Sequence, residues 1–533
     1  MRKRELLSAT ALLTVLTVIM TWPQAQYMGT KVAAHGDAFL SMWRLEWITH
    51  ALTGSVRHLF DGNIFYPHTR TLAYTDATLL EGLLAFPFLW ARANPVLVYN
   101  VLLLGGIITS GVGMYVLARH LTGSADAALV AAAIFTLAPY RIEHFMHLEL
   151  QWTMWMPLAL WGVHRIYETG SVRFGAITGA LLGLQLLSCI YYGAFLGMMV
   201  AVVAVLLALS YPALVRRAIG PLALGALLPA IVIFIYGQPY LANAHELGTR
   251  APGDVASFSA ELVSYVTAPE QNWLWGWTAD RFYGDELRLY PGVIATVLAA
   301  AAFAHRSRRI VWIYAAMAAV AFALSLGFNG PLYRWLYAHV WALAAFRAPA
   351  RFGILVCCAL AVLAAFGFQR LQEALPRFRA RQALLVVALV AVAVDGGSAP
   401  MPLWEVPRQV PDVYKIVKTF EPSVLIELPI ENGDLTSQFM YWSTKHWNPL
   451  VNGYSGYQPA DYTETLEAME TFPDDRSLAR LRSLHVRYIL VHGWFYKPRD
   501  YGNLLLRIAN RPDLVSHGAF RDWLGPTQIF ELR

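Results

Sequence analysis

One carboxylate stands out as a candidate for chemistry. Asp37 follows the first long apolar run of the chain, in the segment HGDAFLSMWRLEW. A charged group at the edge of hydrocarbon is costly and usually serves a function, so Asp37 is our candidate catalytic carboxylate. The structural alternative is an N-cap, a position that Asp favours, on an amphipathic helix over 38–52 that lies on the membrane. Both roles are compatible.

A second polar cluster lies in PYRIEHFMHLELQ at 139–151. At helical spacing, His144 and His147 share one face, and Glu143 meets His147 at i, i+4. We expect the histidines to act as an acid or to orient an acceptor, and the set could hold a divalent metal, Mg²⁺ or Mn²⁺. Polar side chains that only contact lipid headgroups are the alternative, because the spacing matches no zinc motif.

Four arginines are candidates for binding a donor phosphate: Arg141, Arg250, Arg347 and Arg351. Guanidinium groups match phosphate oxygens with two parallel hydrogen bonds. Arginines at a membrane edge also reach lipid headgroups without specificity, and for Arg347 and Arg351 both interpretations stay open.

Aromatic, amide and acidic residues suggest contacts to a sugar or an acceptor. FDGNIFYPH supplies Tyr66 and His68, Glu143 comes from the second cluster, and the tail segment 440–459 supplies His446, Trp447 and Tyr454. Flat rings and amides suit stacking and hydrogen bonding, although Gly and Asn in the same segment equally serve turns. No Walker A, Rossmann, G-x-S-x-G or H-E-x-x-H motif is present, which disfavours ATPase and peptidase chemistry by those motifs.

Composition places these residues in a polytopic membrane protein. Of 533 residues, 57% are hydrophobic and 14% charged, and the mean hydropathy is +0.44. The net charge of +6 comes mostly from short loops, which indicates orientation in a membrane and no nucleic-acid partner. Three cysteines form neither a disulfide framework nor a metal motif. Eleven spans of the right length are predicted at 6–22, 96–118, 125–139, 150–166, 174–189, 191–211, 218–238, 289–304, 310–327, 352–369 and 382–398.

The charge pattern sets the topology. Arginines and lysines alternate in phase if the N-terminus is cytoplasmic and if 78–92 and 331–346 lie in the interface instead of spanning. The prediction is a transmembrane domain over 1–399 with a large outer loop 23–95, and an extracytoplasmic α/β domain over 400–533 with strands at 424–430 and 486–493. The predicted location is the bacterial inner (cytoplasmic) membrane.

The chain resembles the GT-C superfamily of integral-membrane glycosyltransferases. More narrowly, it resembles a group of bacterial membrane proteins that share GDAFLSMWRLEW, FDGNIFYPH, APYRIEHFMH, FRAPARF and STKHWNPLVNGYSGY. The resemblance implies a membrane lipid and a polyprenyl-phosphate sugar as partners, a glycan or protein acceptor, and inversion at the sugar. It implies that Asp37 is the acidic group of the first outer loop, and we expect Asp37 to act as the general base that takes a proton from the acceptor hydroxyl. The acidic pair typical of the superfamily is absent, since Gly36 and Ala38 flank Asp37, so metal dependence and catalytic activity stay open.

Two further functions remain as alternatives. A lipid-linked glycan transporter or flippase would use the same arginines without making a bond, but it predicts ionisable residues in the middle of several spans. The predicted spans carry their charges near their ends instead. The other alternative is a non-catalytic scaffold whose outer domain binds cell-wall polymer. It predicts that Asp37 and the arginines are dispersed, whereas the enzyme predicts that they converge on one outward-facing pocket.

Overall fold

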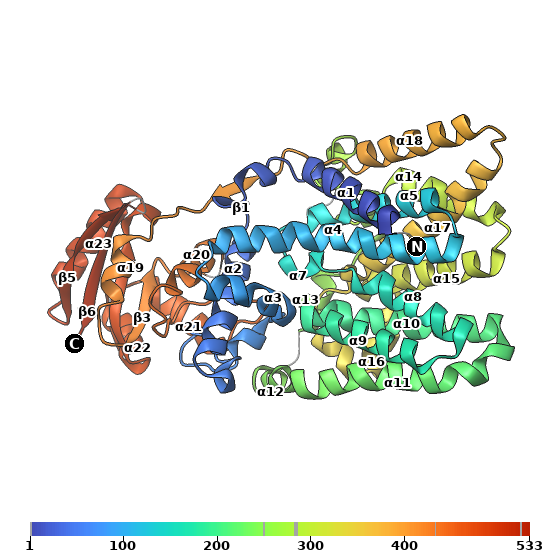
Figure 1. Cartoon of the computed structure of the whole chain (residues 1–533). Coiled ribbons are helices and arrows are strands. Elements are labelled where there is room, and N and C mark those ends of the chain that lie inside the picture. The colour runs from blue at the N-terminus through green and yellow to red at the C-terminus, as the bar shows by residue number, and fades with distance from the viewer. Residues whose placement is uncertain (1–2, 249–250, 282–285, 432, 523–524) are drawn as a thin grey trace. The chain divides into compact units, whose positions relative to one another are not determined.

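The fold is described from a computed structural model of the chain (Figure 1), covering residues 3–248, 251–281, 286–431, 433–522 and 525–533. The chain forms two compact units, and each is built from segments far apart in sequence. Unit 1 comprises Met1–Met28 and Asn100–Leu403, and unit 2 comprises Gly29–Tyr99 and Trp404–Arg533.

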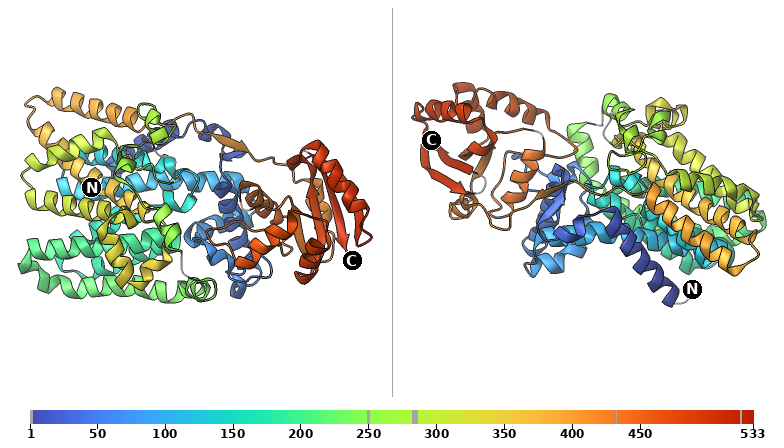
Figure 2. Two further views of the ribbon diagram at one scale, coloured as in Figure 1. Left: turned by 180° about the vertical axis from the view of Figure 1, so that it is seen from behind. Right: turned by 90° about the horizontal axis from the view of Figure 1, so that it is seen from above.

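Unit 1 is a bundle of long helices that run side by side (Figures 1 and 2). A helix occupies each of the eleven predicted ranges: α1 (Lys3–Met20), α4 (Pro95–Thr122, which begins in unit 2), α5 (Ala125–Thr136), α8 (Trp155–Thr169), α9 (Val172–Ser188), α10 (Ile190–Ser210), α11 (Pro212–Tyr236), α14 (Val293–Ala301), α15 (Arg308–Ser325), α17 (Gly353–Glu373) and α18 (Phe378–Asp395). Among the described residues, 6 helices are long and apolar enough to cross a membrane. The count of eleven spans stays a prediction.

The helix α17 lies at the centre of this bundle. It packs against α14, α15 and α5, and nearly all of its residues from Gly353 to Phe368 are buried. Gly367 lets α14 approach closely, because a Cβ at this position would lie 1.7 Å from the carbonyl oxygen of Leu298. A glycine at such a contact removes the side chain that would hold two helix backbones apart.

The α2 helix (Gly36–Thr53) in unit 2 corrects one prediction. The sequence predicts an amphipathic helix over 38–52 that lies on the membrane, but α2 is buried on most sides, and its buried residues include Arg44. It packs between α3 (Leu79–Trp90) and α20 (Asp434–Ser443). The apolar spacing predicted the helix correctly. It did not predict the burial of Arg44, whose guanidinium donates hydrogen bonds to the carbonyl of Asp76 at 2.5 Å and to the hydroxyl of Ser41 at 2.9 Å.

Unit 2 also holds a four-stranded mixed sheet with the order β3-β4-β6-β5. The predicted strands are confirmed as β3 (Val424–Leu428) and β4 (Val486–His492), which pair in parallel. The sheet also contains an antiparallel pair that the sequence did not predict, β5 (Leu514–Asp522) and β6 (Gly525–Leu532). Four helices accompany the sheet: α19 (Asp412–Val417), α21 (Ala460–Met469), α22 (Asp475–Ser483) and α23 (Pro498–Ala509).

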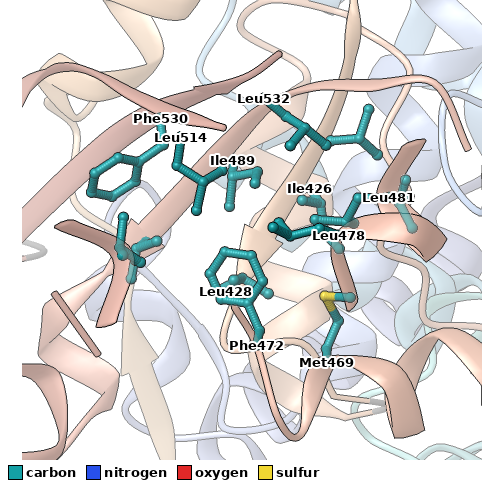
Figure 3. Close-up of a cluster of buried hydrophobic side chains, with 14 of the residues drawn as sticks. Ile426, Leu428, Met469, Phe472, Leu478, Leu481, Ile489, Leu514, Phe530 and Leu532 are labelled. Atoms are coloured by element: carbon teal, nitrogen blue, oxygen red, sulfur yellow. The ribbon is translucent and has the colours of Figure 1, made fainter. Parts of the chain in front are cut away.

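Apolar side chains from the sheet and its helices form one buried core (Figure 3). Ile426 and Leu428 come from β3, Ile489 from β4, and Met469 and Phe472 from the end of α21 and the turn after it. A short second sheet pairs β1 (Lys31–Ala33) with β2 (Leu403–Glu405).

Candidate functional site

A buried ion pair forms the centre of the site in unit 1. The guanidinium of Arg351 donates two hydrogen bonds to Glu286, 2.8 Å from Nε to Oε2 and 2.9 Å from Nη2 to Oε1. Both residues are almost fully buried, at 6% and 9% exposure. Glu286 has a φ of 60°, a left-handed conformation that non-glycine residues rarely adopt and that costs of order 1–3 kcal/mol. The surrounding contacts hold it there.

Two histidines face the same carboxylate. His144 Nδ1 lies 3.7 Å from Glu286 Oε2, and His147 Nε2 lies 3.4 Å from Oε1. Burial alone would raise the pKa of Glu286, but the charge of Arg351 and the contact with His147 hold that pKa well below its usual range. Burial lowers the pKa of His144 to about 3, against the attraction of Glu286. At neutral pH the site therefore combines a carboxylate with a neutral imidazole at His144.

The helical spacing predicted for this segment is wrong. α6 (Tyr140–Glu143) ends before His144, and His147 precedes the next short helix, α7 (Leu148–Gln151). Gln151 stabilises the break, because its side-chain amide donates to the carbonyls of His144 at 2.7 Å and Arg141 at 3.2 Å. The histidine rings meet across this turn, with their centroids 6.0 Å apart.

His144, His147 and Glu286 could hold a metal ion, since one ligand atom from each lies within 4.8 Å of the others. Both ring nitrogens of His144 are buried without a hydrogen-bond partner among the described residues, so either could bind a cation. Two imidazoles and a carboxylate suit Mn²⁺ or Zn²⁺. They do not suit Mg²⁺, which prefers oxygen ligands. An ion here would share Glu286 with Arg351.

Arg347 lies on the same stretch as Arg351 but in a different environment. Its guanidinium stacks over the ring of Phe258 at 4.8 Å and forms no ion pair with any carboxylate in the described part of the chain. Tyr191 links the two arginines, because its hydroxyl accepts from the backbone N–H of Arg347 at 3.1 Å and its ring lies under Arg351 at 4.9 Å. Arg347 is thus available to an anion, whereas Arg351 already holds Glu286.

The remaining candidates of unit 1 have structural partners. Arg141 is buried and donates to the Phe135 carbonyl and to Thr153 Oγ1, both at 2.8 Å, which fixes the loop between α5 and α7. Glu143 is buried, and its Oε2 lies 3.6 Å from Nη1 of Arg288, a partner that the sequence did not indicate. Arg250 lies outside the described residues.

Asp37 belongs to unit 2, in the first turn of α2. The N-cap is His35, whose Nδ1 accepts from the backbone N–H of Asp37 at 3.1 Å. The Asp37 carboxylate lies 3.4 Å from the same nitrogen and is largely buried. Gly36, one residue earlier, donates its N–H to Asp434 Oδ1 at 2.8 Å. The structure therefore gives the capping contact to His35, and Asp434 brings a second carboxylate to this helix end, where the dipole favours negative charge.

Each of the predicted sugar contacts in unit 2 has a partner of its own. His68 pairs with Asp461 at 2.8 Å, and Tyr66 packs against the core of the sheet. Trp447 stacks on His50, with ring centroids 4.3 Å apart. His446 is held by the backbone N–H of Asn448, 3.0 Å from its Nδ1, and the backbone N–H of Tyr454 contacts Met440 Sδ at 3.2 Å.

Three residues of these sites were not predicted from the sequence: Glu286, Arg288 and Asp434. None of the three stands in a motif or next to another candidate. Each is identified only by its contact in the structure: Glu286 with Arg351, Arg288 with Glu143, and Asp434 with Gly36.

Comparison with solved structures decides what fold this is. The arabinofuranosyltransferase AftD from Mycobacteria superposes with a TM-score of 0.67 at 15% identity, over 100% of this chain and 40% of that protein. The oligosaccharyltransferase AglB from Archaeoglobus fulgidus, in complex with an inhibitory peptide and a dolichol-phosphate, gives 0.51 at 12% identity, over 98% and 74%. ArnT from Cupriavidus metallidurans in the apo state gives 0.50 at 13% identity, over 98% and 97%. The chain has a GT-C-like membrane fold.

The likeness extends along the whole chain, although the chain spans only 40% of the length of AftD. No protein-family model matches the sequence, and neither does any curated protein sequence. At these identities the comparison establishes the GT-C-like fold, and the reaction has to be argued from the residues.

Proposed function

We propose that the chain is a membrane glycosyltransferase that takes a sugar from a polyprenyl-phosphate donor and passes it to a cell-envelope acceptor on the outer face of the membrane. The observation that carries the proposal is the GT-C-like fold over the full chain, with Asp37 after the first helix. A lipid-phosphate donor is supported by AglB, which was solved with a dolichol-phosphate. Nucleotide sugars are confined to the cytoplasm, so an outer site needs a donor carried by lipid.

The proposed reaction is a direct displacement. The acceptor hydroxyl attacks the anomeric carbon from the face opposite the phosphate, so that a new C–O bond forms as the bond to the phosphate oxygen breaks and the configuration inverts. Asp37 takes the hydroxyl proton as general base. The products are the glycosylated acceptor and the polyprenyl phosphate.

Arg347 is the residue that we assign to the departing phosphate. Its guanidinium has no carboxylate partner among the described residues and is fixed by stacking on Phe258, so it can stabilise negative charge that grows as the bond breaks. Arg351 acts through Glu286, holding this carboxylate between the histidines. We assign His144 and His147 to orienting the acceptor or to holding a Mn²⁺ or Zn²⁺ ion, which would add charge stabilisation at the phosphate.

A transfer assay tests the proposal. Purified protein in proteoliposomes is incubated with radiolabelled polyprenyl-phosphate pentoses, hexoses and N-acetylhexosamines, together with a cell-envelope glycan fraction. We expect label in the glycan and release of an equal amount of polyprenyl phosphate from one donor class. Movement of labelled lipid across the bilayer with no bond cleavage would instead identify a transporter, and binding without either outcome would identify a scaffold.

A further inference from the structure

A pocket of about 460 Å³ lies in unit 2, and none of the candidate site residues named above lines it. Its volume falls within the range of about 300–1,000 Å³ that is typical of small-molecule sites. It lies where β3 ends, since Leu428, Pro429 and Ile430 form one wall, and Tyr496, shortly after β4, forms another. Because β3 and β4 are parallel, both strands end at the same edge of the sheet. In open α/β sheets, ligands bind at the edge formed by the carboxyl ends of the strands.

Two helices complete the pocket with one face each. From α21 and the residue after it come Leu466, Met469 and Glu470, at i, i+3 and i+4. The α23 helix contributes Asp500, Asn503, Leu504 and Arg507, at i, i+3, i+4 and i+7. This spacing places each set on one side of its helix. The pocket is therefore built from three elements of regular structure.

The floor of the pocket is apolar. Leu428, Met469, Phe472 and Leu504 belong to the buried core cluster, and Figure 3 shows the first three of them grouped together. Tyr496 packs against the same cluster. Its ring stacks with that of Tyr501, with centroids 6.2 Å apart. An apolar floor beside an aromatic ring suits a ligand that has a C–H face.

The rim of the pocket carries polar side chains that can bind a ligand. The side chains of Glu470, Asp500 and Asn503 are exposed, and none of them forms a hydrogen bond or ion pair with another residue in the described part of the chain. Arg507 donates to the carbonyl of Thr471, which keeps its positive charge at the rim. Two carboxylates, one amide and one guanidinium therefore surround the apolar floor.

We propose that this pocket binds a glycan chain through one or two sugar rings. A sugar ring has an apolar C–H face that matches the floor, and each hydroxyl both donates and accepts, which matches carboxylates and an amide. A lipid tail would leave the rim unpaired, and a cationic peptide would meet Arg507. The pocket would hold the acceptor of the transfer proposed above, and to that extent the proposal rests on that function.

Binding can be measured without any donor. The full chain in lipid nanodiscs, free of maltoside detergent, is titrated with arabinan, mannan and chitin trisaccharides and followed by saturation-transfer difference NMR. We expect one class of trisaccharide to bind, and Asn503→Ala and Leu466→Trp, which fills the pocket, to weaken binding at least tenfold. Arg499→Ala on the same helix, outside the pocket, is the matched control and should bind as the wild type does.

The outcomes separate this proposal from the proposed function. No binding of any trisaccharide, or equal binding by Leu466→Trp and the wild type, would overturn the pocket assignment, as would binding of a lysine-rich tripeptide in place of the sugars. Trisaccharide binding that is lost in Leu466→Trp supports the pocket even if the chain transfers no sugar. Sugar transfer by a protein whose pocket binds no trisaccharide would support the proposed function and overturn the pocket assignment.

Discussion

Arg351 and Glu286 form a two-point ion pair between positions 65 residues apart, at 2.8 and 2.9 Å, inside the helical bundle. Removing one partner of a buried pair leaves an uncompensated charge, which costs about 3–5 kcal/mol. We therefore expect Arg351→Ala to lower the thermal unfolding midpoint of the detergent-solubilised protein strongly. Arg347→Ala is the matched control: it loses mainly a stacking contact worth about 0.5–1 kcal/mol and should leave the midpoint nearly unchanged.

In donor binding we expect the opposite order: Arg347→Ala should lose more affinity for the donor than Arg351→Ala. Arg347 has no carboxylate partner among the described residues, so we expect Arg347→Ala to weaken binding of a polyprenyl phosphate by about tenfold or more, since hydrogen bonds to charged groups contribute about 1.5–3 kcal/mol. Isothermal titration with the lipid in nanodiscs measures this. Equal affinity of Arg347→Ala and the wild type would exclude Arg347 as the phosphate ligand.

The cluster of His144, His147 and Glu286 makes a prediction about metals. Protein purified in the presence of Mn²⁺ or Zn²⁺ and then washed should retain about one ion per chain by elemental analysis. His144→Phe should lose it, and Mg²⁺ should not replace it. Wild-type protein without bound Mn²⁺ or Zn²⁺ would assign the histidines to orienting the acceptor alone.

His446 predicts how the stability of unit 2 depends on pH. Burial lowers its pKa to about 4 from 6.5, so the unfolded chain binds the proton more readily than the folded one. Its contribution to stability is complete above about pH 6.5 and is lost as pH falls toward 4, by up to about 1.4 kcal/mol per pH unit. His446→Asn retains an acceptor for the Asn448 N–H and cannot titrate. Unfolding midpoints measured from pH 7 to pH 4.5 should fall less steeply for this variant, and parallel curves would contradict the assignment.

Gly36 links the start of α2 to Asp434, and the contact leaves no room for a side chain. A Cβ there would lie 2.5 Å from Asp434 Oδ1 and 2.9 Å from Ser437 Oγ. Gly36→Ala should therefore destabilise the protein by about 1–3 kcal/mol and, because Asp37 is the next residue, slow transfer. Gly502→Ala, at a helical glycine with open space around it, is the control and should be neutral or slightly stabilising.

Local pattern predicted the helices and two strands well, because apolar runs and periodicity are properties of short segments. The α2 helix shows the limit: its spacing was correct, but only the packing of α3 and α20 reveals that Arg44 is buried. The turn that holds His144 and His147 shows another limit, because Gln151 stabilises this break in the helix through hydrogen bonds that residue spacing does not encode. Glu286 and Asp434 could not be predicted at all, since each acquires its role from a partner 65 or 398 positions away.

The central claim is that Asp37 takes the proton of the acceptor, and Asp37→Asn tests it most directly. The variant retains the size and polarity of the side chain and removes the base. With the donor class found in the transfer assay, the account predicts a kcat lower by about 10²–10⁴-fold, with unchanged unfolding midpoint and polyprenyl-phosphate affinity. A folded Asp37→Asn protein that transfers sugar at the wild-type rate would contradict it.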